Sequence, residues 1–167
     1  MKNPDGFASG SAALATRLIP VFQRAAKEAI EMRVKKIDHV GIAVEDLEAV
    51  PEALRKLLSP DPPEVEEVPE QGVRTTSYHA GGTSIEFLES SREGSPVGRY
   101  LARKGNGIHH VALEVDDLEG ALAELKAGGV ELIDEVPKTG AGGKRIAFIH
   151  PRSAGGILIE LCSKAPA

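Results

Sequence analysis

Aromatic side chains, cysteine and basic charge are all scarce in this sequence. Its 167 residues include no tryptophan, two tyrosines, four phenylalanines and one cysteine, and 20 Lys and Arg residues stand against 25 Asp and Glu. The net charge of −5 and the few aromatics argue against binding to nucleic acid or carbohydrate. Because Cys162 is alone, neither an internal disulfide nor a cysteine-based zinc site can form. No run of eighteen apolar residues occurs, so we expect no membrane span and a cytoplasmic location.

The length corresponds to about one domain with an appendage, since a typical domain has ~150 residues. Residues 1–10 are polar and contain Gly and Pro, which is typical of a disordered start. From Ser11 onward, apolar residues recur every three to four positions and predict a helix that Pro20 kinks or delays. We therefore divide the chain into an N-terminal extension (1–33) and a domain (34–167), with Met32 as an alternative start of translation.

An internal repeat organises the domain. Shifting the chain by 71 residues places IDHVGIAVEDLEAV, from Ile37, over IHHVALEVDDLEGA, from Ile108. Beyond three extra residues in the second copy, an offset of 74 places the apolar run around Glu86 over the one around Glu160. The copies cover about 34–90 and 105–163, and agreement over this length indicates a duplication.

Both copies predict the same order of elements. A β-branched run at Ile37–Val44 predicts a strand, and Asp46 then caps a stretch of helix-forming residues. Pro51 either marks the first turn of that helix or distorts it. In the second copy, three strands are expected after the helix, near Glu131–Val136, Arg145–His150 and Ile157–Cys162. The domain is therefore predicted to be α+β and to consist of two β-α-β-β-β units.

The repeat selects four polar residues as a candidate metal site. Alternation along a strand turns His109 and His110 to opposite faces, and His110 is the one that overlays His39. Glu86 and Glu160 overlay each other inside apolar runs, where a carboxylate is costly unless it is paired, hydrogen-bonded or bound to a metal. Taken alone, each of these histidines suits a structural role. Two imidazoles and two carboxylates related by pseudo-twofold symmetry suit a divalent metal, with positions left for water or substrate.

The remaining histidines and the cysteine have simpler explanations. His79 and His150 also overlay, but each stands where a strand meets a Gly- or Pro-bearing turn, so we expect solvated loop side chains. His109 is expected to face away from the site. Cys162 shares a strand face with Glu160 and is expected to be a buried structural thiol, with a role near the metal as the alternative.

With these residues assigned, the sequence resembles the vicinal oxygen chelate superfamily, the group of glyoxalase I and the extradiol dioxygenases. The segments IDHVGIAVEDLE and VPEQGVRT, and the stretch GIHHVALEVDDLEGALAELKAGGVELIDEVPKTGAGGKRIAFIHPRSAGGILIEL, resemble more narrowly the methylmalonyl-CoA epimerase family. The resemblance covers residues 34–163. It implies a glyoxalase-like curved mixed sheet around a metal, with ligands at His39, Glu86, His110 and Glu160.

The resemblance also implies an isomerase that interconverts (2R)- and (2S)-methylmalonyl-CoA. Removal of the C2 proton, α to a thioester and a carboxylate, gives an enolate that a divalent cation stabilises. Glu160 is implied to be both a metal ligand and an acid/base group. Thr75 occupies the position of a second carboxylate found in some members, and it is a poor base, so the second proton donor is left open between water on the metal, Glu160 alone and another residue. Cobalt is the implied metal, although manganese, zinc, nickel and magnesium also accept these ligands, and the implied assembly is a homodimer.

Two other functions use the same fold. A glyoxalase I-like lyase acting on a glutathione hemithioacetal would have the same four ligands, and a metal-free small-molecule-binding protein would need none of them. An extradiol dioxygenase fits less well, because its 2-His-1-carboxylate iron site does not require Glu86. Four cations around the GAGG and PRSAGG turns either contact the phosphates of CoA or are solvated surface charge; they are Lys138, Lys144, Arg145 and Arg152.

Overall fold

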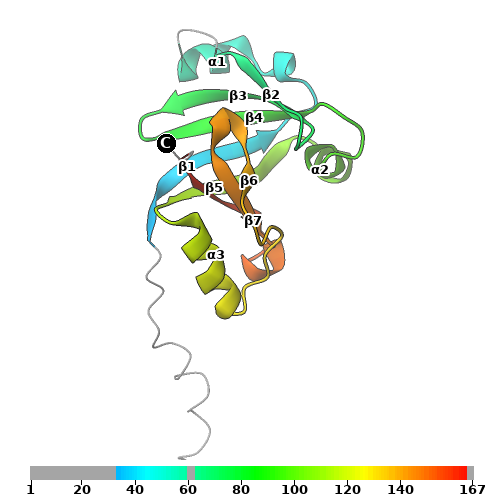
Figure 1. Cartoon of the computed structure of the whole chain (residues 1–167). Coiled ribbons are helices and arrows are strands. Elements are labelled where there is room, and N and C mark those ends of the chain that lie inside the picture. The colour runs from blue at the N-terminus through cyan, green and yellow to red at the C-terminus, as the bar shows by residue number, and fades with distance from the viewer. Residues whose placement is uncertain (1–32, 60–62, 165–167) are drawn as a thin grey trace, which may run out of the picture. The chain divides into compact units, whose positions relative to one another are not determined.

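Eight strands form one mixed sheet within residues 33–59 and 63–164, the residues that this computed structural model describes (Figure 1). In space the strands follow the order β2-β3-β4-β1-β5-β8-β7-β6. Their bounds are β1 (Val34–Ala43), β2 (Val65–Val68), β3 (Val73–Ala80), β4 (Thr83–Ser90), β5 (Gly107–Val115), β6 (Lys138–Thr139), β7 (Arg145–Ile149) and β8 (Ile159–Ser163). The predicted N-terminal helix and the boundary at residue 33 lie outside or at the limit of these residues and stay predictions.

The middle of the sheet carries the internal symmetry. β1 and β5, which begin the two copies, pair antiparallel, while β4 pairs parallel to β1 and β8 pairs parallel to β5. A rotation that exchanges β1 with β5 therefore also exchanges β4 with β8. The α+β class and the two β-α-β-β-β units predicted from the repeat are confirmed.

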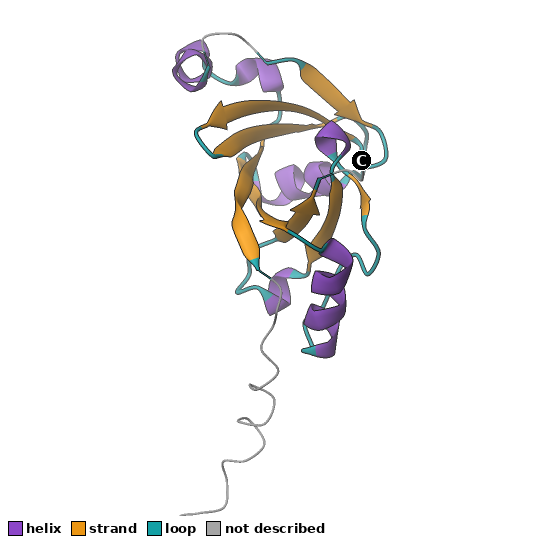
Figure 2. Cartoon of the chain, turned by 60° about the vertical axis from the view of Figure 1, so that its left-hand side comes forward, coloured by secondary structure: helices purple, strands orange, loops and turns teal. Residues whose placement is uncertain are grey.

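Three α-helices accompany the sheet in the described part of the chain (Figure 2): α1 (Glu52–Leu58), α2 (Pro96–Lys104) and α3 (Leu118–Ala127). None of them has the length and apolar character that crossing a bilayer requires. Asp46 caps only a 3-10 turn, η2 (Leu47–Ala49), and Pro51 is the N-cap of α1, so the α-helix begins at this proline and not at Asp46. The helix α2 between the copies was not predicted; Ser95 caps it, accepting from the Gly98 N–H, and Pro96 begins it.

The strand predicted near Glu131–Val136 is wrong. That segment contributes one isolated bridge, between Leu132 and Ile149, and the next strand is the two-residue β6. Asp134 explains the loss, because its carboxylate accepts the Phe148 N–H of β7 at 2.9 Å in place of a backbone carbonyl. Pro137 then lacks the N–H that would continue a ladder.

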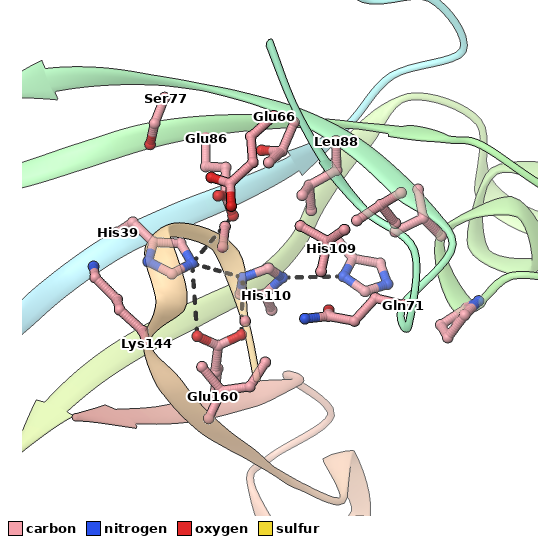
Figure 3. A pocket seen from close by; sticks show the side chains of 18 of the residues that line it. His39, Glu66, Gln71, Ser77, Glu86, Leu88, His109, His110, Lys144 and Glu160 are labelled. Atoms are coloured by element: carbon pink, nitrogen blue, oxygen red, sulfur yellow. Dashed lines mark hydrogen bonds and ion pairs between the residues drawn. The ribbon is translucent and has the colours of Figure 1, made fainter. Parts of the chain in front are cut away.

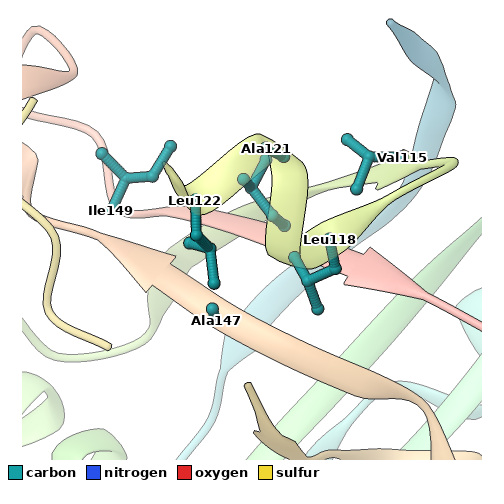
Figure 4. Close-up of a cluster of buried hydrophobic side chains, with 7 residues drawn as sticks. Val115, Leu118, Ala121, Leu122, Ala147 and Ile149 are labelled. Carbon is teal, nitrogen blue, oxygen red and sulfur yellow. The ribbon is translucent and has the colours of Figure 1, made fainter. Parts of the chain in front are cut away.

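Helix α3 covers one face of the second copy (Figure 4). Asp117 caps it by accepting the Gly120 N–H at 2.9 Å. Its apolar side buries Leu118, Ala121 and Leu122 in a cluster that includes Leu161 of β8. Because neighbouring side chains on a strand point to opposite faces, anchoring Leu161 against α3 directs Glu160 to the other face.

Candidate metal centre and active-site cavity

A cavity of about 520 Å³ contains all four predicted ligands. They come from the four central strands: His39 from β1, Glu86 from β4, His110 from β5 and Glu160 from β8. All four side chains are buried, with exposed fractions between 3% and 8%. The two copies thus contribute one histidine and one glutamate each, at positions that the pseudo-twofold relation makes equivalent.

The donor atoms of His39, His110 and Glu160 lie together, and the Glu86 carboxylate lies beside His39 (Figure 3). Nε2 of His39 lies 3.0 Å from Nε2 of His110, 3.3 Å from Oε2 of Glu86 and 3.9 Å from Oε1 of Glu160. Nε2 of His110 lies 3.7 Å from Oε2 of Glu160. Nitrogen and oxygen donors about 2.1 Å from a common cation lie about 3 Å apart when they are adjacent in its coordination sphere.

Three of these residues meet the stricter condition that every pair of donors be close. One donor atom from each of His39, His110 and Glu160 lies within 4.8 Å of the other two. Among the described residues, the ion pair that joins Glu86 to this group is with His39. Two buried imidazoles and buried carboxylates facing a common centre fit a divalent cation, because such ligands suit transition metals and the deprotonated donors need a positive partner.

A β-bulge places Asp38 beside His39. Along the β1–β5 ladder, Ile37 faces Leu113 and His39 already faces Ala112, so Asp38 is the extra residue on β1. Its Oδ2 lies 3.0 Å from Nδ1 of His39. A carboxylate in this position fixes the tautomer that leaves Nε2 free for a cation and holds the ring in orientation.

Lys144 lies between η3 (Ala141–Gly143) and β7, and its ammonium group pairs with the Asp38 carboxylate. Burial by itself would raise the pKa of Asp38, but hydrogen bonds from His39 and Lys144 outweigh it and hold that pKa well below its usual range. Asp38 is therefore ionised next to the site. Strand alternation gave no sign of this residue, because a bulge leaves no signature in the sequence.

The residues around this site match known proteins. Residues 38–148 match the Glyoxalase/Bleomycin resistance protein/Dioxygenase superfamily. The ethylmalonyl-CoA/methylmalonyl-CoA epimerase of Cereibacter sphaeroides is 36% identical over 130 residues, which cover 77% of this chain and 97% of the relative. The crystal structure of methylmalonyl-CoA epimerase from Mycobacterium tuberculosis has a TM-score of 0.74 at 36% identity and covers 80% of this chain and 90% of that one.

The chain belongs to the methylmalonyl-CoA epimerase family. The resemblance predicted from the sequence is thereby confirmed, together with the glyoxalase-like fold. A Streptomyces coelicolor methylmalonyl-CoA epimerase variant in complex with 2-nitronate-propionyl-CoA is also similar, with a TM-score of 0.74 at 33% identity over 81% of this chain and 98% of that one.

In this member of the methylmalonyl-CoA epimerase family, His109 does not face away from the site. A second bulge makes it the extra residue on β5, since Gly41 faces His110 while Ile42 faces Ile108. His109 lines the cavity, and its Nδ1 lies 3.1 Å from Nδ1 of His110. The prediction from regular alternation was wrong because the bulge turns two successive side chains to the same side.

The other predicted side chains lie near or outside the cavity. His79 is exposed at its rim and contacts Ser84 Oγ at 3.0 Å, whereas His150 accepts the Arg152 N–H at the start of a 3-10 turn, η4 (Pro151–Ser153). Cys162 is buried, as expected of a structural thiol, and burial raises its pKa to about 12.

The four cations considered for CoA are all paired with acidic side chains. Lys138 and Lys144 line the cavity, where they pair with Asp134 and Asp38. The other two pair with acidic residues elsewhere and do not line it: Arg145 with Glu119 and Arg152 with Glu131. Arg92 and Arg99 line the cavity instead, and sequence reasoning did not select them.

Burial controls the protonation of the metal-free site. It raises the pKa of Glu160 to about 8, and the neighbouring Glu86 carboxylate adds to this effect. It also raises the pKa of Glu86 and, together with His39 and His109, lowers the pKa of His110 well below 6.5. A cation must displace the proton of Glu160 to bind, so metal uptake is expected to release protons.

We expect the free energy of unfolding of the metal-free protein to fall as pH rises from about 6.5 to about 8. The pKa of Glu160 is raised on folding, so its stabilising contribution is present below the unfolded value of 4.5 and is lost as pH rises through about 8. Below 6.5 the buried His110 opposes this trend, because it resists protonation in the folded state.

Urea unfolding of chelator-treated protein at pH 6.5, 7.2 and 8 measures the slope of the unfolding free energy against pH. For one proton this slope cannot exceed about 1.4 kcal/mol per pH unit. Glu160→Gln removes the titrating group and should flatten it. An equal slope in this variant would contradict the assignment.

Replacing Asp38 with asparagine is expected to weaken metal binding by about 10–100-fold, the usual cost of losing a carboxylate that orients a ligating histidine. Asparagine retains an acceptor for Nδ1 of His39 but loses the charge, and it leaves Lys144 unpaired. Isothermal titration with Co²⁺ gives the affinity. Asp116→Asn is the control, since Asp116 pairs with Lys35 outside the cavity; equal affinities for both variants would contradict the role of Asp38.

Proposed function

We propose that this protein interconverts the C2 epimers of methylmalonyl-CoA in a reaction that requires a divalent cation. The observation that carries the proposal is the buried set of two histidines and two glutamates that line one cavity, in a chain of the methylmalonyl-CoA epimerase family. No nucleophile or organic cofactor is needed, because the reaction removes and returns one proton.

The side chains would divide the work as follows. His39 and His110 would hold the cation with Glu86 and Glu160, and Asp38 would keep the His39 ring in orientation. When bound, the cation supplies Lewis-acid stabilisation of the negative charge that develops on the thioester. Glu160 accepts the C2 proton at its carboxylate oxygen, and its burial favours the protonated form that results.

Cobalt as the native metal and methylmalonyl-CoA as the preferred acyl-CoA belong to this proposal. The Streptomyces coelicolor relative bound to 2-nitronate-propionyl-CoA supports a site of this kind for an acyl-CoA. The homodimer and the cytoplasmic location expected from the sequence stay predictions.

Proton exchange at C2 tests the proposal. Purified protein is stripped with a chelator, supplied with Co²⁺ or Mn²⁺ and incubated with methylmalonyl-CoA in heavy water, while NMR follows the C2 proton and chiral analysis follows epimerisation. We expect both processes with metal and neither without it. Absence of exchange with either metal rejects the epimerase, conversion of a glutathione hemithioacetal instead would indicate a glyoxalase, and metal-independent ligand binding without turnover would indicate a binding protein.

A further inference from the structure

Epimerisation places a demand on the cavity that Glu160 alone does not meet. Once the C2 proton has left, C2 is planar, and a group on one side returns the proton only to that side. Inversion needs a second proton-transfer group on the opposite side. Thr75 does not supply one, because its buried hydroxyl donates to the Phe87 carbonyl at 3.0 Å and is not acidic near neutral pH.

Strand β2, which pairs with the strand of Thr75, carries a carboxylate directly opposite that residue. In the β2–β3 ladder Glu66 lies directly opposite Thr75, and both line the cavity. Directly paired residues of antiparallel strands project to the same side, with Cβ atoms about 5 Å apart. The Glu66 side chain therefore starts from the same part of the sheet as the side chain of residue 75, and it projects to the same side.

Glu66 is also held over the cavity from the other copy. The Gly142 N–H donates to both of its carboxylate oxygens, at 2.9 and 3.0 Å. Its charge acts on Glu86, whose pKa it helps to raise, so the two carboxylates share one region of the cavity. In Figure 3, Glu66 lies above the two histidine rings and Glu160 lies below them, on the opposite wall.

The other carboxylates of the cavity are less suited to this task. Asp38 is bound to His39 and Lys144, and Glu86 and Glu160 belong to the donor cluster. Glu64 precedes β2, and Glu70 lies in the turn that follows it. Among the carboxylates that line the cavity in the described residues, Glu66 is the one that a strand pairing places beside Thr75.

We propose that Glu66 is the second acid/base group of the reaction, acting from β2 in place of residue 75. The inference rests on the proposed function. In one direction the Glu160 carboxylate removes the C2 proton, and the electrons of the C–H bond remain on the substrate as the enolate. The protonated Glu66 then forms the new C–H bond on the opposite face and becomes a carboxylate. The reverse reaction exchanges these roles, and exchange with water returns both groups to their starting states.

The variant Glu66→Gln tests this role without removing the bridge between the copies, because glutamine still accepts the Gly142 N–H. Glu67→Gln is the matched control: it lies on the same exposed strand but does not line the cavity. Each pure epimer is incubated in heavy water with the metal-loaded protein. Inversion, deuterium at C2 of the recovered starting epimer and metal content are measured.

For Glu66→Gln we expect inversion to fall by at least about 100-fold, with the metal content of the wild type. Deuterium should still enter C2 of the epimer that Glu160 deprotonates, so that exchange exceeds inversion. The double variant Glu66→Gln/Thr75→Glu should recover inversion. Wild-type inversion by Glu66→Gln, or equal losses of inversion and exchange from both epimers, overturns the role of Glu66. Failure of the wild type to epimerise overturns the proposed function itself.

Discussion

Replacing Glu160 with glutamine should reduce epimerisation by about 10²–10⁴-fold, the range that general acid–base catalysis contributes. Glutamine preserves the volume of this buried side chain and one oxygen donor, but it cannot accept the C2 proton. Unlike the Glu66 variant, this one should lose deuterium exchange in the epimer that Glu160 deprotonates. Rates of inversion and of exchange, measured on each epimer separately, give the two effects.

Glu114→Gln is the matched control for this prediction. Glu114 is also a strand glutamate with little exposure, but it pairs with Lys35 and Lys36 outside the cavity. The control should keep wild-type rates. Wild-type rates in Glu160→Gln would show that Glu160 has no part in proton transfer. The melting temperature is measured as well, and a value equal to that of the wild type would show that a lower rate does not reflect unfolding.

Replacing His110 with alanine should abolish stoichiometric metal binding and reduce epimerisation to the level of the chelator-treated protein. The variant loses a donor 3.0 Å from Nε2 of His39, so the affinity should fall by more than the 10–100-fold expected for Asp38→Asn. Cation at 100 times its dissociation constant stabilises the folded protein by about 2.7 kcal/mol. A 100-fold weaker site would retain only about 0.4 kcal/mol at the same concentration.

Metal analysis and thermal unfolding with and without Co²⁺ measure these changes. His150→Ala is the control, because His150 lies outside the cavity. Gly41→Ala is a milder test: a Cβ there would lie 2.3 Å from Cε1 of His110, so the ring must move although its donor remains. Gly82→Ala, which meets open space, is the control for Gly41. Full metal binding by His110→Ala would show that the cation is held by other residues.

The repeat made the central part of the site predictable. It overlays His39 with His110 and Glu86 with Glu160, and the structure brings these four side chains together on the four middle strands. Strand pairing follows the repeat because each copy folds in the same way, so positions related by sequence become positions related by rotation.

The parts that could not be predicted depend on departures from regular strands. Bulges at Asp38 and His109 bring both residues to the cavity side, where alternation placed only their neighbours. Glu66 gave no signal, because its place opposite Thr75 depends on a register between β2 and β3 that composition does not determine. The strand predicted near residue 133 was lost to the Asp134 side chain, which competes with the backbone for the Phe148 N–H.

The division of the four proposed donors between the copies would couple metal occupancy to the cooperativity of unfolding. His39 and Glu86 belong to one copy and His110 and Glu160 to the other, and the cation would join them across the β1–β5 ladder. A chain in which either copy has opened retains only two donors and loses most of its affinity. Bound metal should therefore slow amide hydrogen exchange of β1 and β5 together, because partial openings that separate them are suppressed. The cation would therefore link the two copies of the repeat in the folded protein, in addition to its role in the reaction.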